Sequence, residues 1–152
     1  MHHLAVRSIP KWPAIVDAAV DRLEAAGAIV ERITLPGENL LDLFHHHCFT
    51  GAAARLSAIS PDQRSAIDPG FLEIARDGAA YTSTELVTAQ VCRADFGAAM
   101  DRLLSDFDSS SRPELRSQPS EVPANGSHTR WTEWAGFSFP INLSQQPACV
   151  IP

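Results

Sequence analysis

Apolar residues recur at helical spacing in the first part of the chain. Val16, Val20 and Leu23 lie three or four residues apart, so they share one face of a helix. Pro13 suits the first turn of such a helix, and Gly27 is typical of the position just past its end. The pattern therefore predicts a helix between these two residues.

The next segments alternate between extended and helical patterns. Residues 29–35 predict a short strand that ends in Leu-Pro, and residues 38–54 predict a second helix with a small-residue second half. Pro61 ends or restarts that helix, because proline has no backbone N–H to donate. A short helix is expected over residues 71–75.

The strongest helix signal begins at Thr82. Together with Glu85 it forms the Thr-x-x-Glu pattern of a capping box, in which each residue satisfies a backbone N–H of the other. Apolar residues then recur on one face up to the end of the helix near Asp108. They are Leu86, Ala89, Phe96, Met100, Leu103 and Phe107.

Residues 109–128 are rich in Ser, Pro, Arg, Asn and Gly and hold almost no apolar side chains. Taken alone, this composition predicts a polar surface loop. The stretch separates the predicted helix that ends near Asp108 from a C-terminal segment of a different character.

The C-terminal segment carries the clustered aromatic residues. Trp131 and Trp134 are three residues apart, so in a helix they share a face with Phe137. This face is either a hydrophobic clamp that holds the segment to the sheet or an aromatic wall of a substrate pocket. Asn142 and Gln145, with Ser144 between them, are candidates for polar substrate contacts, but the turn-forming tendency of Asn and Pro explains them equally well.

Residues 130–152 resemble the C-terminal segment of amidase signature enzymes. That family has a Trp-rich, Phe-containing approach, then an Asn-x-(Ser/Thr)-(Gly/Gln)-x-Pro-Ala turn, and then an apolar strand that ends in proline. Weaker matches precede this segment in the family's order. They are the stretch 18–36, the Asp-Pro-Gly-Phe-Leu of 68–72, Gly78, Ser83, Ala89, Arg93 and the Phe107-Asp108 pair.

The resemblance implies an α/β fold. Residues 1–152 would be a partial, C-terminal amidase signature domain, part of an α/β/α arrangement in which helices flank a mixed sheet, and mostly helical as a fragment. The family hydrolyses the C–N bond of carboxamides without a cofactor or metal. The implied partners are a small-molecule amide and either the missing N-terminal half or a second copy in a homodimer.

The catalytic groups of that family have no counterpart in these 152 residues. The family uses a Ser-cis-Ser-Lys triad on a Gly/Ser-rich loop, whereas this sequence has no Gly-Ser-Ser-Gly-like stretch and Lys11 is its only lysine. The Ser109–Ser111 triplet lacks the adjacent base and the Gly-lined loop that expose a nucleophilic serine. We therefore expect the fragment to be inactive alone, with Trp131, Trp134, Phe137, Asn142 and Gln145 as its substrate-binding candidates.

The resemblance also gives residues 109–120 a second interpretation. The family has a buried Leu-Leu-Leu-Thr-Pro strand here, followed by Ile-x-Ala-Phe. Codons for Ser-Ser-Ser-Arg-Pro, starting at Ser109, encode Leu-Leu-Leu-Thr-Pro when read one base earlier. In the same neighbouring frame, the Ser-Gln-Pro-Ser of residues 117–120 becomes Ile-Ala-Ala-Phe. The patch is therefore either a true loop or a frame-shifted strand.

Charge and apolar run lengths restrict the partners. The formal net charge is −6, which argues against direct nucleic-acid binding because phosphate neutralisation needs clustered Lys and Arg. No apolar run reaches the ~20 residues of a membrane span. Cys48, Cys92 and Cys149 are widely spaced and odd in number, which favours buried free thiols in a cytoplasmic protein.

Histidines at residues 45–47 invite a metal interpretation. Consecutive helical residues point about 100° apart, whereas a helical zinc site prefers i and i+4 spacing. An interface or pocket-lining histidine is therefore favoured, and no metal is expected. His2 and His3 are interpreted as terminal polar residues.

Two alternatives stay open at this point. The first alternative belongs to the same family: the chain would be a fragment of the A subunit of a tRNA-dependent amidotransferase, which hydrolyses the amide of glutamine. The second alternative is a different class of protein: a noncatalytic helical interaction protein whose apolar helix faces are covered by a partner.

Overall fold

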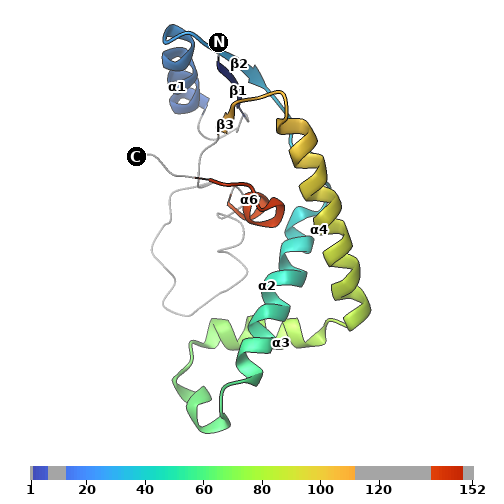
Figure 1. The fold of residues 1–152 in the computed structure, drawn as a ribbon. Helices are drawn as coiled ribbons and strands as arrows, with labels where there is room; N and C mark the ends of the chain where they lie inside the picture. The colour runs from blue at the N-terminus through green and yellow to red at the C-terminus, as the bar shows by residue number, and fades with distance from the viewer. Residues whose placement is uncertain (1, 7–12, 112–137, 149–152) are drawn as a thin grey trace.

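The computed structural model describes residues 2–6, 13–111 and 138–148. Figure 1 shows a small sheet next to a set of helices, with the long helices α2 and α4 extending away from the sheet. The elements in chain order are β1 (His2–Val6), α1 (Pro13–Ala25), β2 (Ala28–Arg32), α2 (Leu40–Ser57), the 3-10 helix η1 (Pro61–Ala66), α3 (Pro69–Ala80), α4 (Ser83–Leu104), β3 (Ser109–Ser111) and α6 (Phe139–Ser144).

The sheet has three strands in the order β2-β1-β3, and both pairings are parallel. His2 of β1 pairs with Ala28 of β2, and Leu4 pairs with Ser109 of β3. Because parallel neighbours need a long crossover connection, α1 bridges β1 to β2. The interpretation of His2 and His3 as mere terminal residues is wrong, since both belong to the central strand.

The first predicted helix and strand are present. α1 begins at Pro13, and Gly27 has φ +91°, the left-handed conformation that a glycine adopts at lowest cost. The strand that follows is shorter than predicted, because its pairing with β1 ends at Arg32. Residues 33–39 then lead to α2.

The starts of α2 and α3 are marked by the backbone conformation of Asn39 and by a cap at Asp68, respectively. Asn39 precedes α2 in the left-handed region, with φ 54°. α3 is longer than the predicted 71–75 helix because its start is fixed by Asp68, whose carboxylate accepts a hydrogen bond from the N–H of Phe71 at 3.1 Å. Pro69 occupies its first turn.

The predicted capping box of α4 is confirmed. The Glu85 carboxylate accepts hydrogen bonds from the N–H of Thr82 at 2.7 Å and from its hydroxyl at 2.8 Å. In return, the Glu85 N–H donates to the Thr82 hydroxyl at 3.2 Å. On the predicted apolar face, Ala89, Phe96 and Met100 are buried.

Two apolar clusters form the core of the described residues. The first joins α2, α4 and α6 and contains Leu43, Ala89, Phe96, Met100, Phe139 and Leu143. The second joins α2 and α3 and contains Phe49, Ala52, Ile74 and Ala75. α2 is therefore the element common to both clusters, and it fixes the position of α4 relative to α3.

The C-terminal segment differs from its predicted form. Residues Phe139–Ser144 make the short helix α6, and Gln145 ends it with φ 60°. Asn142 therefore lies within a helix and not in a turn; Pro140 in the first turn favours this start. Arg93 of α4 holds the helix in place by donating from Nε to the Leu143 carbonyl at 3.0 Å.

Among the described residues, no helix combines the length and apolar character needed to cross a bilayer.

Candidate functional site

The candidate site is a groove between the start of α2 and α4 from Thr84 to Ala99, with a volume of about 630 Å³. This volume is in the range of small-molecule sites in proteins. Its lining residues are Gly37, Glu38, Asn39, Leu40, Asp42, Leu43, His46, Thr84, Glu85, Thr88, Ala89, Cys92, Asp95, Phe96 and Ala99.

The floor of the groove is apolar. Leu43, Ala89 and Phe96 line it and belong to the first core cluster, and Leu40 packs against that cluster. Because the same side chains stabilise the α2–α4 packing, the floor is preformed. The groove therefore offers an apolar surface formed by packed core residues.

The walls of the groove are acidic. Glu38 and Asp42 come from the α2 side, and Glu85 and Asp95 come from α4. No lysine or arginine is among the described lining residues. The electrostatic potential in the groove therefore favours positively charged groups.

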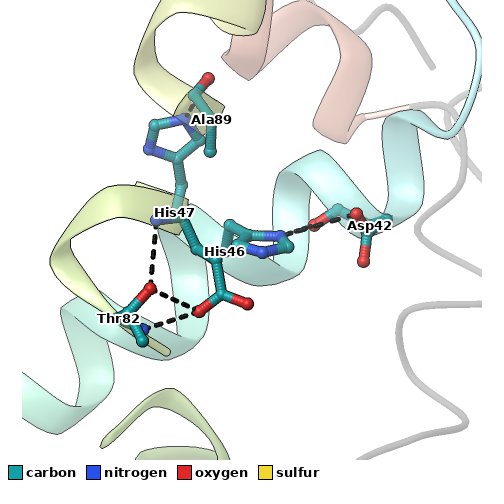
Figure 2. Close-up of polar contacts among 6 residues, drawn as sticks. Asp42, His46, His47, Thr82 and Ala89 are labelled. Atoms are coloured by element: carbon teal, nitrogen blue, oxygen red, sulfur yellow. Dashed lines mark hydrogen bonds and ion pairs between the residues drawn. The ribbon is translucent and has the colours of Figure 1, made fainter. Parts of the chain in front are cut away.

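His46 lines the groove from α2 and contacts Asp42 of the same helix. Its Nδ1–H donates to the Asp42 carbonyl at 2.9 Å, and the Asp42 carboxylate lies 3.6 Å from the same nitrogen. Figure 2 shows the ring beside Asp42 on α2. A carbonyl only accepts, so Nδ1 carries a proton in this contact. The His46 ring also stacks on Tyr81, with centroids 4.1 Å apart.

Two groups next to His46 have shifted pKa values. Hydrogen bonds from the backbone and side chain of Thr82 lower the pKa of the Glu85 carboxyl, and the charge of His46 acts in the same direction. Burial raises the pKa of Tyr81, and the carboxylates of Asp42, Asp77 and Glu85 raise it further. Glu85 is thus held as an anion at the groove, while Tyr81 keeps its proton.

The three consecutive histidines have three different surroundings. His45 stacks on Phe49 with centroids 4.5 Å apart, and His46 lines the groove. His47 Nε2 lies 3.3 Å from the Ala89 carbonyl, so this side chain joins α2 to α4, as Figure 2 shows. Within the described ranges, no three His, Cys, Asp or Glu side chains are grouped as metal ligands.

The cysteines differ from the predicted pattern of buried thiols. Cys92 is exposed and lines the groove, which contradicts that prediction. Cys48 is half-buried, and burial raises the pKa of its thiol. Cys149 lies outside the described residues.

Two of the five predicted substrate-binding residues, Asn142 and Gln145, lie in the described part of the chain. Asn142 and Gln145 are exposed on α6 and at its end, and neither lines the groove. The neighbouring Gln146 side-chain amide donates to the Asp101 carboxylate. Trp131, Trp134 and Phe137 lie outside the described residues, so their predicted role stays a prediction.

The acidic walls were not identified from the sequence. The sequence of α4 contains a pattern that could have indicated them. Three or four residues separate its successive members beside the apolar face: Glu85, Thr88, Cys92 and Asp95. This spacing indicates a shared edge of the helix. It does not indicate that the edge faces Asp42 of α2, because that contact depends on tertiary packing.

Comparison with known proteins gives a partial match. No protein-family model matches the chain. The chain is similar to a 2-amino-5-chloromuconic acid deaminase of Comamonas testosteroni, with 28% identity over 153 aligned positions. The match covers 88% of this chain but 33% of the deaminase, so the chain spans about a third of the length of that relative.

Proposed function

We propose that this chain is the C-terminal part of an amidase signature hydrolase that acts on carboxamide C–N bonds. The observation that carries the proposal is the match of 88% of the chain to a deaminase, whose name describes removal of an amino group. The amidase-like residues at 130–152 support the same class independently. The fragment is expected to work in the cytoplasm.

The proposed fold is the α/β/α arrangement of that family. Its support is the parallel β2-β1-β3 sheet, in which α1 connects β1 to β2 and the helices α2 to α4 connect β2 to β3. This is the crossover pattern of an α/β protein. In the complete enzyme, we propose that further strands and helices extend this sheet.

The proposed role of the chain is to shape a substrate site, not to perform the bond cleavage. Lys11 is its only lysine, and no Gly/Ser-rich nucleophile loop accompanies it. Ser109–Ser111 form the strand β3 and not a turn. Trp131, Trp134 and Phe137 are proposed to line the acyl side of the substrate pocket, with Asn142 and Gln145 as polar contacts.

The test is ammonia release by the purified chain. The substrates are a panel of aliphatic and aromatic carboxamides, glutamine and 2-amino-5-chloromuconic acid, and the Comamonas testosteroni deaminase serves as the positive control. We expect no ammonia above the buffer rate, because a nucleophile without an activating base is unreactive. Circular dichroism must show helical content in the same sample, so that absence of turnover reflects absent chemistry.

Turnover by the isolated chain would contradict the proposal, and two variants locate its source. Loss of that turnover in Lys11→Met would reveal an unforeseen serine–lysine site within the chain. Turnover that survives Lys11→Met and replacement of Ser109–Ser111 by alanine would rule out the fragment proposal.

A further inference from the structure

The α2–α4 groove combines an apolar floor with acidic walls. Its floor is built from apolar side chains of the core, including Leu43 and Phe96. Carboxylates stand on both walls, from Asp42 on α2 and from Glu85 and Asp95 on α4. A ligand that fits both features has an apolar body and a positive charge.

The wall carboxylates have no lysine or arginine partner in the described part of the chain. Arg32 forms its ion pair with Asp17, away from the groove, and no lysine or arginine pairs with Glu38, Asp42, Glu85 or Asp95. Glu85 is bonded to Thr82, and the Asp42 carboxylate approaches only His46. Among the described lining residues, no lysine or arginine neutralises this negative potential, which favours a cationic ligand.

The apolar floor of the groove favours an organic cation over a metal ion as the ligand. A hard divalent cation prefers six or more oxygen ligands around a polar site. Here no group of three metal-ligating side chains occurs among the described residues, and the floor is formed by Leu40, Leu43, Ala89 and Phe96. An organic cation buries its apolar part on this floor while its ammonium group reaches a wall carboxylate.

We propose that the α2–α4 groove binds a small organic cation, a protonated primary amine carried on an aromatic or aliphatic body. The aromatic or aliphatic body lies on the floor beside Phe96. The ammonium group donates hydrogen bonds to the Asp42 or Asp95 carboxylate. This site is independent of the proposed amidase function, since it needs no catalytic group.

The experiment is a titration of the full ¹⁵N-labelled chain, followed by amide chemical shifts at pH 7 and low salt. The probes are 2-phenylethylamine, the neutral 2-phenylethanol and the anionic 3-phenylpropionate. We expect the amine to bind with a dissociation constant on the order of 1 mM, as befits a ligand of this size. The shift changes should be confined to residues that line the groove, such as Asp42, Cys92 and Asp95.

Charge variants test the role of the walls. The double variant Asp42→Asn/Asp95→Asn should weaken amine binding about fivefold to tenfold, because each exposed ion pair contributes up to about fivefold. The matched control Asp21→Asn/Asp62→Asn removes the same charge from exposed positions that do not line the groove and should leave the affinity unchanged.

A variant that fills the groove tests where the amine binds. Thr88→Trp places a large ring in the groove and should abolish binding, whereas Gln90→Trp on the same helix, at a position that does not line the groove, should not. Equal affinity for the amine and the alcohol would overturn the proposal. Equal loss of amine affinity in the two charge variants, or unchanged amine binding in Thr88→Trp, would also overturn it. Shift changes outside the groove, or no binding of the amine at 10-fold above the expected dissociation constant, also overturn it.

Discussion

Gly78 of α3 lies directly against the Phe49 carbonyl of α2. A Cβ atom placed on Gly78 would be 1.9 Å from the Phe49 oxygen and 2.7 Å from the Thr50 nitrogen. Both atoms belong to the backbone of a helix and cannot move aside as a flexible side chain does. The close approach of α2 and α3 therefore depends on the absence of a side chain at this position.

We predict that Gly78→Ala destabilises the chain, although alanine is the better helix former. The added methyl group must push α3 away from α2 and disturb the cluster around Phe49 and Ile74, at a cost of about 1 to 3 kcal/mol or more. Chemical denaturation followed by circular dichroism measures this change in the free energy of unfolding.

The matched control for this prediction is Gly51→Ala in α2. Nothing lies within 4 Å of a Cβ at Gly51, so this substitution only gains helix propensity and should stabilise by about 0.5 to 1 kcal/mol. Equal effects of the two substitutions would show that α2 and α3 are not in close contact.

Tyr81 should ionise above its ordinary pKa of 10.0, because burial and the nearby carboxylates of Asp42, Asp77 and Glu85 disfavour its anion. Tyr81 is the only tyrosine, so absorbance at the phenolate wavelength reports it alone. Since the folded state holds this proton more tightly than the unfolded state, its contribution to stability is present below pH 10 and is lost as the pH rises through the folded pKa.

Removal of one of the neighbouring charges tests the cause of this shift. Asp42→Asn should move the Tyr81 titration midpoint toward 10.0, while Asp21→Asn, on the exposed side of α1, should leave it in place. A midpoint at or below 10.0 in the unaltered chain would mean that Tyr81 does not lie between these carboxylates.

The capping box should make the start of α4 sensitive to acid. The pKa of Glu85 is lowered from 4.5, so its contribution to stability is present above pH 4.5 and is lost as the pH falls through the lower, folded value. Hydrogen exchange of the first amides of α4 should therefore speed up in this range. Thr82→Ala should lower the free energy of unfolding by about 0.5 to 2 kcal/mol at neutral pH.

Glu85→Gln provides the comparison for this prediction. Glutamine keeps the capping geometry but does not titrate, so the acid-dependent part of the exchange should disappear in this variant. An identical pH dependence in Glu85→Gln and the unaltered chain would assign the effect to other carboxylates.

The elements that were predicted correctly are those encoded in short stretches. Thr82 and Glu85 specify the start of α4 through hydrogen bonds three residues apart. Similarly, Gly27 specifies the end of α1 through its backbone conformation. Such features depend on neighbouring residues alone, so they are visible in the sequence.

The features that were missed depend on distant parts of the chain. β1 is recognised only by its pairing with β2 and β3, which come 26 and 105 positions later in the registers His2–Ala28 and Leu4–Ser109. The acidic groove arises because α2 and α4 place Asp42 and Glu85 on facing walls. α6 is fixed by the hydrogen bond from Arg93, fifty residues earlier in the chain.

The gene sequence around residues 109–120 should decide the origin of the polar patch. Ser109–Ser111 pairs with the central strand β1, and residues 112–128 lie outside the described residues. If a frame shift replaced a buried strand, the frame one base earlier should encode Leu-Leu-Leu-Thr-Pro from the last base of the Asp108 codon onward. A one-base loss before Ser109 and a gain near Glu121 would complete this pattern.

Nucleotide sequencing across this region provides the measurement. Codons whose neighbouring frame encodes neither the leucines nor Thr-Pro would remove the frame-shift hypothesis. Residues from Ser109 onward would then be a true polar segment, with β3 as a short native strand at its start.

The DNA upstream of the Met1 codon tests the proposed function most directly. If the chain is the C-terminal part of an amidase signature hydrolase, that DNA should encode, in the same or a neighbouring frame, a Gly/Ser-rich loop with the two serines and the lysine that these 152 residues lack. An upstream region with no such coding sequence in any frame would contradict the proposal, despite the similarity to the deaminase.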